Sequence, residues 1–280
     1  MHSILLPLND ERQDRHALAV GTQLADFFGG HLTALLPLTD FASLPVPHHP
    51  LLAGWDGLVA QSHAFAERRE AEVRRLLYEL ELLPGPNGEE RPNFNFQAVY
   101  GSDDAVVMDA ALTHDLVVFA RGDEEDDDEG VPVSPLLKCT IESAGRPVLI
   151  TTGKLALDWT RTAAIAWNGS LEAAHAVTAA LPLLRRAEAV HIVTFPTIRT
   201  DAARAQQLVD YLARHGITAT PRIEDAETPI GEALLEAVED LSATFLVMGG
   251  YTHSRLRQTL FGGVTHHVLE KARLPVLMAR

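Results

Sequence analysis

The chain has 280 residues, of which 46% are hydrophobic and 22% are charged, so it holds enough apolar material for one large or two ordinary globular cores. Its formal net charge of −15 argues against nucleic acid or an anionic membrane surface as a partner, because both would repel it. The single cysteine, Cys139, excludes an internal disulfide bond, and the chain has neither a signal-peptide pattern nor a membrane-spanning apolar run. We therefore expect a cytoplasmic protein.

Short apolar runs predict strands and recur in the same order in the two halves of the chain. They lie at 4–8, 31–35, 116–120 and 147–150, and again at 163–167, 191–195, 245–249 and 275–278. Between them, apolar residues at helical spacing predict helices. The clearest such patterns are Val20–Phe28, Val73–Leu80, Ala205–Leu212 and Ile230–Ala237. Strands that alternate with helices predict two tandem Rossmann-like or flavodoxin-like α/β domains, each an open parallel sheet with helices on both faces.

The repeat places the domains at residues 1–152 and 160–280, with the boundary in the stretch Thr151–Thr162. Two local signals support the helices of the second copy. Ser170 is a good N-cap for the helix that follows the first strand, and Gly216 fits the position just beyond a helix end.

Glycine pairs mark one connection in the second copy. The apolar run Phe245–Met248 ends in Gly249 and Gly250, and a second pair, Gly262 and Gly263, opens the next helix. Backbone N–H groups at such turns and helix starts bind anions, with the helix dipole adding to the attraction. In open parallel sheets, ligands bind beyond the carboxyl ends of strands where the strand order reverses. If the strands ending at Asn168 and Gly249 are neighbours, Asn168 faces the glycine loop.

These residues resemble the universal stress protein family in its tandem form. In each copy the first strand ends in Asn and the last begins Pro-Val-Leu. The closing segment of the second copy is similar to that family's nucleotide loop, Gly-x2-Gly-x9-Gly-Ser/Thr, with Gly249, Thr252, Gly262 and Gly263 at the four named positions. The resemblance implies five parallel strands in each domain, last strands that meet to form a pseudo-dimer within the chain, and a non-catalytic stress-response protein that binds an adenine nucleotide, ATP or AMP, in the second domain.

The site that the resemblance and the glycine pattern imply departs from the family at three positions. Thr252 replaces a glycine, Gly263 replaces the Ser or Thr, and Asn168 stands where family members usually carry Asp. The candidate nucleotide-binding residues are Ala166, Trp167, Asn168, Gly249, Gly250, Thr252, Ser254, Arg255, Gly262, Gly263, Val264 and Thr265. No catalytic residue and no metal ligand is predicted.

The first copy is expected to hold no nucleotide. Ala120 stands where the second copy has Gly249, and Pro135, which has no N–H, stands where it has Gly263. The acidic run Asp123–Glu129 would repel phosphate, and it lacks the calcium-loop spacing, so we expect a solvated loop. The three prolines of Leu44–Pro50 forbid a regular helix or central strand there.

The sequence leaves several alternatives open. Trp167 can stack on a base or pack in the core, and Arg255 can neutralise phosphate or pair with surface carboxylates. Sequence motifs of P-loop nucleotidases, α/β-hydrolases and zinc proteases are absent. Two alternatives to the nucleotide-binding interpretation stay open. One is a nucleotide-independent interaction or scaffold protein with vestigial sites, and the other is a slow ATP hydrolase. Association of two chains into a homodimer also stays open.

Overall fold

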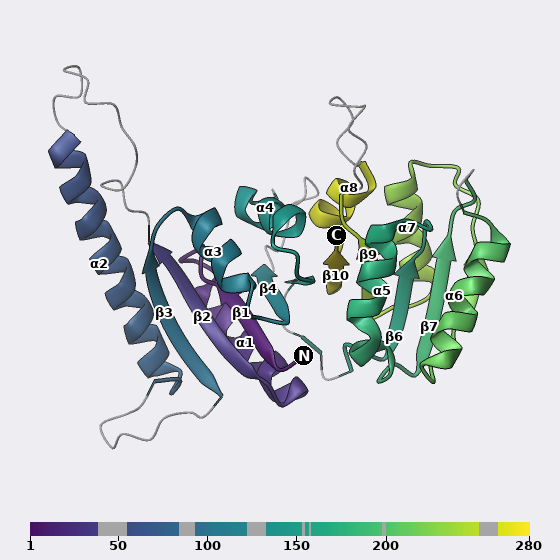
Figure 1. The fold of residues 1–280 in the computed structure, drawn as a ribbon, viewed down its shortest axis with the longest axis horizontal. Coiled ribbons are helices and arrows are strands. Elements are labelled where there is room, and N and C mark those ends of the chain that lie inside the picture. The colour runs from purple at the N-terminus through teal and green to yellow at the C-terminus, as the bar shows by residue number, and fades with distance from the viewer. Residues whose placement is uncertain are drawn as a thin grey trace. The chain divides into compact units, whose positions relative to one another are not determined.

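The computed structural model describes residues 1–38, 55–83, 93–121, 133–152, 155–156, 158–197, 200–251 and 263–280. These residues form an α/β fold of eight helices and ten strands (Figure 1). By their internal contacts they divide into two compact units, Met1–Val117 and Val118–Arg280. The predicted domains 1–152 and 160–280 follow the sequence repeat instead, and that assignment stays a prediction. The acidic run and the proline segment lie outside the described residues.

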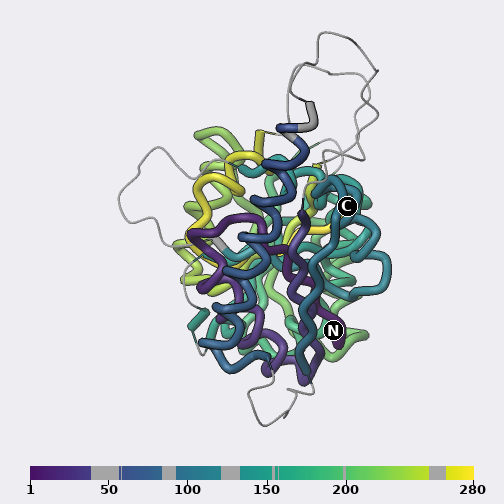
Figure 2. Tube along the Cα trace, turned by 90° about the vertical axis from the view of Figure 1, so that its left-hand side faces the viewer, coloured from purple at the N-terminus to yellow at the C-terminus, as the bar shows by residue number. Residues whose placement is uncertain are grey.

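The first unit alternates strands with helices. Its elements are β1 (Ser3–Pro7), α1 (Asp14–Phe28), β2 (His31–Leu38), α2 (Trp55–Glu79), β3 (Phe94–Tyr100), α3 (Asp103–Ala111) and the start of β4 (Leu116–Arg121). The parallel strands lie in the order β3-β2-β1-β4. Right-handed crossovers between them put α1 and α2 on one face and α3 on the other. Figure 2 shows α2, in blue, running alongside the strands of this unit.

A buried ion pair joins α1 to α2. Asp14 is 2% exposed and Arg69 is 8% exposed, and the Nη2 of Arg69 lies 2.5 Å from the Oδ2 of Asp14. Burial raises the pKa of the Asp14 carboxyl, and the Arg69 guanidinium opposes that rise. Each buried charge compensates the desolvation cost of the other, so removal of either one leaves an uncompensated charge in the interior. The pair therefore fixes which faces of the two helices meet.

The substitution Arg69→Met should lower the free energy of unfolding by about 3–5 kcal/mol near pH 7, because it leaves a buried carboxylate without its cation. The deficit should shrink near pH 5, since the folded variant then holds a proton on Asp14 that the unfolded chain gives up more readily. Urea unfolding at both pH values measures this. The double variant Asp14→Leu with Arg69→Met is the control and should recover most of the loss; a single-variant loss under about 1 kcal/mol would contradict the role of the pair.

The second unit repeats the alternation and adds the last strand of the first repeat. Its elements after β4 are α4 (Pro135–Ser143), β5 (Val148–Thr152), β6 (Thr162–Ala166), α5 (Leu171–Leu184), β7 (Ala189–Thr194), α6 (Ala202–Arg214), β8 (Thr220–Ile223), α7 (Ile230–Asp240), β9 (Phe245–Gly249), α8 (Gly263–Lys271) and β10 (Val276–Ala279). The strand order is β5-β10-β9-β6-β7-β8. Strands β6 to β10 are parallel, and β5 pairs with β10 antiparallel. The last strands of the two repeats thus pair, as the family resemblance implied.

The helices of the second unit begin and end where the sequence signals stand. The hydroxyl of Ser170 accepts from the N–H of Ala173 and caps α5, as predicted. Gly216, with φ of 75°, follows the end of α6 in the left-handed conformation that favours glycine. Helices α5 and α6 cover one face of the sheet, while α7 and α8 pack together on the other (Figure 1). The inner strands β9 and β10 are consequently buried, with Phe245 at the start of β9 fully buried, whereas the edge strand β8 is exposed.

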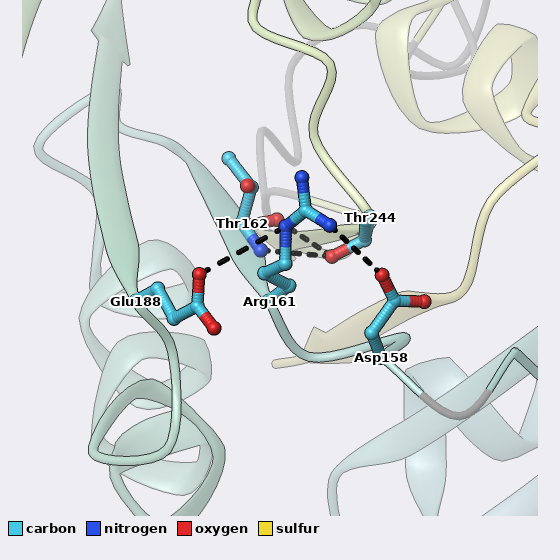
Figure 3. A network of polar contacts seen from close by, with 5 residues as sticks. All are labelled: Asp158, Arg161, Thr162, Glu188 and Thr244. Atoms are coloured by element: carbon cyan, nitrogen blue, oxygen red, sulfur yellow. Dashed lines mark hydrogen bonds and ion pairs between the residues drawn. The ribbon is translucent and has the colours of Figure 1, made fainter.

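The starts of β6, β7 and β9 are tied together by a polar network (Figure 3). The hydroxyl of Thr244 accepts from the N–H of Thr162 at 2.9 Å and donates to the carbonyl of the same residue at 3.1 Å. Arg161 pairs with Asp158 at 3.2 Å and approaches Glu188 at 3.9 Å, and all three side chains are exposed. The hydroxyl is therefore the stronger tie, because exposed ion pairs contribute little.

Thr244→Val keeps the side-chain shape and removes the hydroxyl, so we expect a loss of about 1–3 kcal/mol in unfolding free energy from the unsatisfied N–H of Thr162. Thr244→Ser should retain most of that stability. Arg161→Ala, measured by the same urea titration, should cost no more than about 1 kcal/mol. A larger loss for Arg161→Ala than for Thr244→Val would reverse this ranking.

Candidate functional site

A cavity of about 220 Å³ lies at the carboxyl ends of β6, β7 and β9 in the second unit. Its lining comes from three strand ends and from the first turns of α7 and α8. The lining residues are Ala166, Trp167, Asn168, Val193, Phe195, Thr197, Ile230, Leu234, Met248, Gly249, Gly263, Val264 and Thr265. Most of the surface is apolar, with a few polar groups at defined places, which is the usual composition of a small-molecule site.

Parallel strand pairing explains why residues far apart in sequence meet here. Ala166 at the end of β6 pairs with Met248 on β9 and with Val193 on β7. From β6 the chain proceeds to β7 and β8 on one side of the sheet, and it returns to β9 and β10 on the other side of β6. The cavity therefore lies at the point where the strand order reverses. This is the position at which open α/β sheets bind ligands.

The cavity brings together many of the residues predicted from the sequence. Ala166, Trp167, Asn168, Gly249, Gly263, Val264 and Thr265 all line it. Gly250 does not. Thr252, Ser254, Arg255 and Gly262 lie outside the described residues. The pattern of strand ends and glycine pairs therefore located one cavity, and whether it binds a nucleotide stays a prediction.

Asn168 lies at the turn between β6 and α5. Its side-chain Oδ1 accepts from the N–H of Ser170 at 3.1 Å, a local turn that leads into the capped start of α5. The amide oxygen is thereby used within the turn. The amide N–H₂ is the part of Asn168 that can donate to a molecule in the cavity.

Trp167 combines the two interpretations left open by the sequence. It is partly buried and also lines the cavity, and its main-chain N–H donates to the carbonyl of Val193 at 2.9 Å. The indole Nε1 is buried and has no hydrogen-bond partner among the described residues. A buried donor without an acceptor costs free energy, so the indole N–H is a cost of this fold.

Close packing, rather than a positive φ, explains the first glycine pair. A Cβ on Gly249 would lie 2.6 Å from the main-chain N of Ala173, and a Cβ on Gly250 would lie 2.6 Å from the Cγ2 of Ile141 on α4. The N–H of Gly250 donates to the carbonyl of Ala279 at 2.8 Å. This N–H is thus used within the sheet and is not offered to an anion.

The left-handed residue after β9 is Tyr251, whose φ is 35°. Its ring lies 5.9 Å from the Nζ of Lys138 on α4, a cation–π contact. Burial, together with the nearby Glu142 carboxylate, raises the pKa of the Tyr251 phenol to about 12. The phenol is neutral at physiological pH, and the start of the following loop is held against α4.

The start of α8 closes one side of the cavity. Gly263 is exposed and a Cβ there would meet no atom of the described residues within 4 Å, while Thr265 is 6% exposed. The amides of a helix's first turn have no partner within the helix, so they favour a negative charge. On the outer side, His266 lies 3.2 Å from Glu270. Within the described ranges, no group of three or more His, Cys, Asp or Glu residues is placed to hold a metal ion.

Sequence reasoning missed Met248 on β9 and the wall formed by the end of β7 and by α7, namely Val193, Phe195, Thr197, Ile230 and Leu234. These residues look like ordinary core residues in the sequence. The signal that could have found them is positional, because β7 neighbours β6 and its carboxyl end must reach the same edge of the sheet.

A second, larger cavity lies in the first unit, at the ends of β1 and β2. It has a volume of about 1050 Å³. Its charged lining is mixed in sign, with Asp10, Glu11 and Asp103 facing the same space as Arg12, Arg68 and Arg69. The absence of a nucleotide from this unit stays a prediction.

Gly250→Ala should lower the free energy of unfolding by about 1–3 kcal/mol, because Ile141 is β-branched and cannot easily turn its Cγ2 away from the new Cβ. Adding Ile141→Leu, which removes that branch, should recover part of the loss in thermal and urea unfolding. Gly263→Ala is the matched control and should be neutral, since its Cβ enters open space. Equal losses for Gly250→Ala with and without Ile141→Leu would contradict the packing explanation.

The described part of the chain contains no helix that is both long and apolar enough to cross a membrane. A parallel sheet with helices on both faces and a cavity at its point of reversal defines a Rossmann-like α/β protein. Residues 148–280 match the model of the universal stress protein family.

Solved structures similar to the whole chain show the same tandem fold. A universal stress protein from Archaeoglobus fulgidus is 17% identical with a TM-score of 0.67, and the match covers 99% of this chain and 97% of that one. A putative universal stress protein from Pseudomonas aeruginosa is 18% identical with a TM-score of 0.57, over 99% and 92% of the two chains. Among curated protein sequences none matches. At these identities the likeness establishes the fold, not the ligand.

Proposed function

We propose that the protein is a non-catalytic stress-response protein of the cytoplasm that binds an adenine nucleotide, ATP or AMP, at the cavity of the second unit. The observation that carries the proposal is the convergence of three strand ends and the start of α8 on one cavity at the point where the strand order reverses. The match of residues 148–280 to the universal stress protein family supports an adenine nucleotide as the ligand.

The apolar wall suits the base of a nucleotide. Val193, Ile230 and Met248 present hydrophobic side chains to the cavity, and a planar heterocycle gains by leaving water for such a surface. The volume of about 220 Å³ is below the roughly 300–1000 Å³ of sites that enclose a drug-sized ligand. The cavity therefore takes the base and part of the ribose, and the phosphates extend along the start of α8.

Two donors would fix the orientation of the nucleotide. Asn168 and Trp167 both line the cavity, and the N–H₂ of Asn168 and the indole N–H of Trp167, once a small side-chain movement exposes it, can donate to ring nitrogens or ribose oxygens. The phosphates would then lie near the first turn of α8, where Gly263 is exposed and the dipole favours negative charge.

The first repeat, under this proposal, is a structural partner without nucleotide. The pairing of β5 with β10 supports a pseudo-dimer of the domains 1–152 and 160–280, because it joins their last strands directly. The lining of the cavity in the first unit holds three carboxylates and three guanidinium groups, so it offers a triphosphate no net positive charge.

One observation favours the nucleotide-independent scaffold as a second candidate. The N–H of Gly250, one of the main-chain donors expected to face an anion, is already used by Ala279. Fewer free amides weaken a phosphate site. The scaffold and the nucleotide-binding proposals differ in whether ATP binds at all, and a hydrolase would differ further in releasing phosphate.

Gly263→Asp tests the proposal without disturbing the packing, because the new side chain enters open space and an acidic residue suits a helix start. It should weaken ATP binding about tenfold or more through repulsion of the phosphates, and should change adenosine binding by less than about twofold. Gly263→Asn, of the same size and uncharged, is the matched control. Isothermal titration calorimetry measures the affinities of the unaltered protein and of both variants for ATP and adenosine.

Each outcome bears on a different part of the proposal. Absence of heat with millimolar ATP and AMP in the unaltered protein would favour the scaffold. If Gly263→Asp weakened the binding of ATP and of adenosine equally, the phosphates would not lie at the start of α8. Steady phosphate release that Gly263→Asp reduces in parallel with ATP affinity would favour the hydrolase.

A further inference from the structure

The cavity of about 1050 Å³ in the first unit has no part in the proposed nucleotide site. It lies between the ends of β1 and β2, one side of α2 and the start of α3. The buried side chains of Leu8, Leu36 and Leu38 form an apolar base, and the exposed Phe65 of α2 borders the opening. All lining residues belong to Met1–Val117, so one unit supplies the whole cavity.

The charges of the lining are separated by element. The charged lining residues are Asp10, Glu11, Arg12, Arg68, Arg69 and Asp103. Helix α2 contributes guanidinium groups and no carboxylate, the start of α3 contributes a carboxylate, and the turn after β1 contributes both signs. A molecule in the cavity therefore meets positive charge on the side of α2 and negative charge on the side of α3.

Only one of the three guanidinium groups is neutralised by carboxylates. Arg69 pairs with the buried Asp14, and its Nε lies 3.6 Å from a carboxylate oxygen of Glu11. The guanidinium groups of Arg12 and Arg68 form no ion pair with a carboxylate of the described residues. Both groups are thus available to a negatively charged group in the cavity.

The carboxylate at the start of α3 likewise has no cation beside it among the described residues. Desolvation, together with the neighbouring Asp104 carboxylate, raises the pKa of Asp103, and no basic side chain offsets the rise. A positive charge placed near such a carboxylate stabilises its ionised form. Asp103 is therefore suited to an ammonium group.

Volume and charge together define the ligand. A cavity of about 1050 Å³ is roughly 10 Å across, and an extended chain of three residues spans about the same length. A short peptide can thus reach both sides with its two charged ends, whereas a single amino acid carries both charges on one carbon. The apolar base favours apolar side chains. Because such a peptide has no net charge, the net charge of −15 does not repel it.

We propose that the cavity of the first unit binds a short peptide of two or three apolar residues, with its terminal carboxylate at Arg68 and its terminal ammonium group at Asp103. Each contact is a charge-assisted hydrogen bond, the stronger class of such bonds. The proposal does not rest on the nucleotide site, because the two cavities share no lining residue.

Trileucine is the probe, and its forms with an amidated carboxyl end or an acetylated amino end are the matched controls. Isothermal titration calorimetry with the full-length protein should show saturable binding of trileucine at millimolar concentration. Each capped form should bind about tenfold or more weakly, because it lacks one of the two charges.

Two variants assign the ends of the peptide. Arg68→Gln should weaken trileucine about tenfold and change the amidated form by less than about twofold, and Asp103→Asn should do the same with the acetylated form spared. Both side chains are exposed, so both variants should fold, which thermal unfolding checks. Arg75→Gln and Asp104→Asn, on the same two helices but outside the lining, are the control variants and should leave trileucine affinity within about twofold.

The proposal is overturned if trileucine gives no heat at millimolar concentration or if the capped forms bind as tightly as trileucine. It is also overturned if Arg68→Gln weakens all three forms equally, because the carboxylate would then not lie at Arg68.

Discussion

Parallel pairing of β6 with β9 is the constraint on which the candidate site depends. Three helices and two strands separate β6 from β9 in the sequence. The register nevertheless sets Ala166 beside Met248 and so brings the carboxyl ends of β6 and β9 to one edge of the sheet. Asn168, Gly249 and the start of α8 converge there only because of that register. A shift of the β6–β9 register by one residue would turn every side chain of the shifted strand to the opposite face of the sheet, and the cavity would not form.

The repeat in the sequence was enough to predict the fold class and four of the five strands of the second copy, whereas the exposed edge strand β8 was missed. Hydrophobic runs and helical spacing act through short-range geometry, and Ser170 and Gly216 mark helix ends by rules that need no tertiary information. The position of the cavity followed from the same reasoning, because parallel strands of alternating α/β units bring their carboxyl ends together.

What the sequence could not predict depends on contacts between distant elements. The sequence of Gly249 and Gly250 suggested an anion-binding turn. In the structure, glycine is needed at these two positions because α5 lies too close to Gly249, and α4 too close to Gly250, for a Cβ to fit. Nothing local identified Tyr251 as the residue with a positive φ. The apolar wall from β7 and α7 resembles any buried surface until the sheet order is known.

The two repeats differ at the carboxyl end of their first strand. In the second, Asn168 and Ser170 form a turn that leads directly into a capped helix. In the first, Asp10 accepts from the N–H of Arg12, and α1 begins only at Asp14, next to a cavity with several carboxylates. The same fold thus presents a mainly apolar cavity with uncharged donors in one copy and a mixed-charge cavity in the other.

A crystal structure of the protein grown with ATP is the most direct test of the central claim. The account predicts the adenine base between the ends of β6 and β7 and the wall from α7, with the phosphates at the first turn of α8. A nucleotide bound elsewhere, or an empty cavity at millimolar ATP, would contradict it.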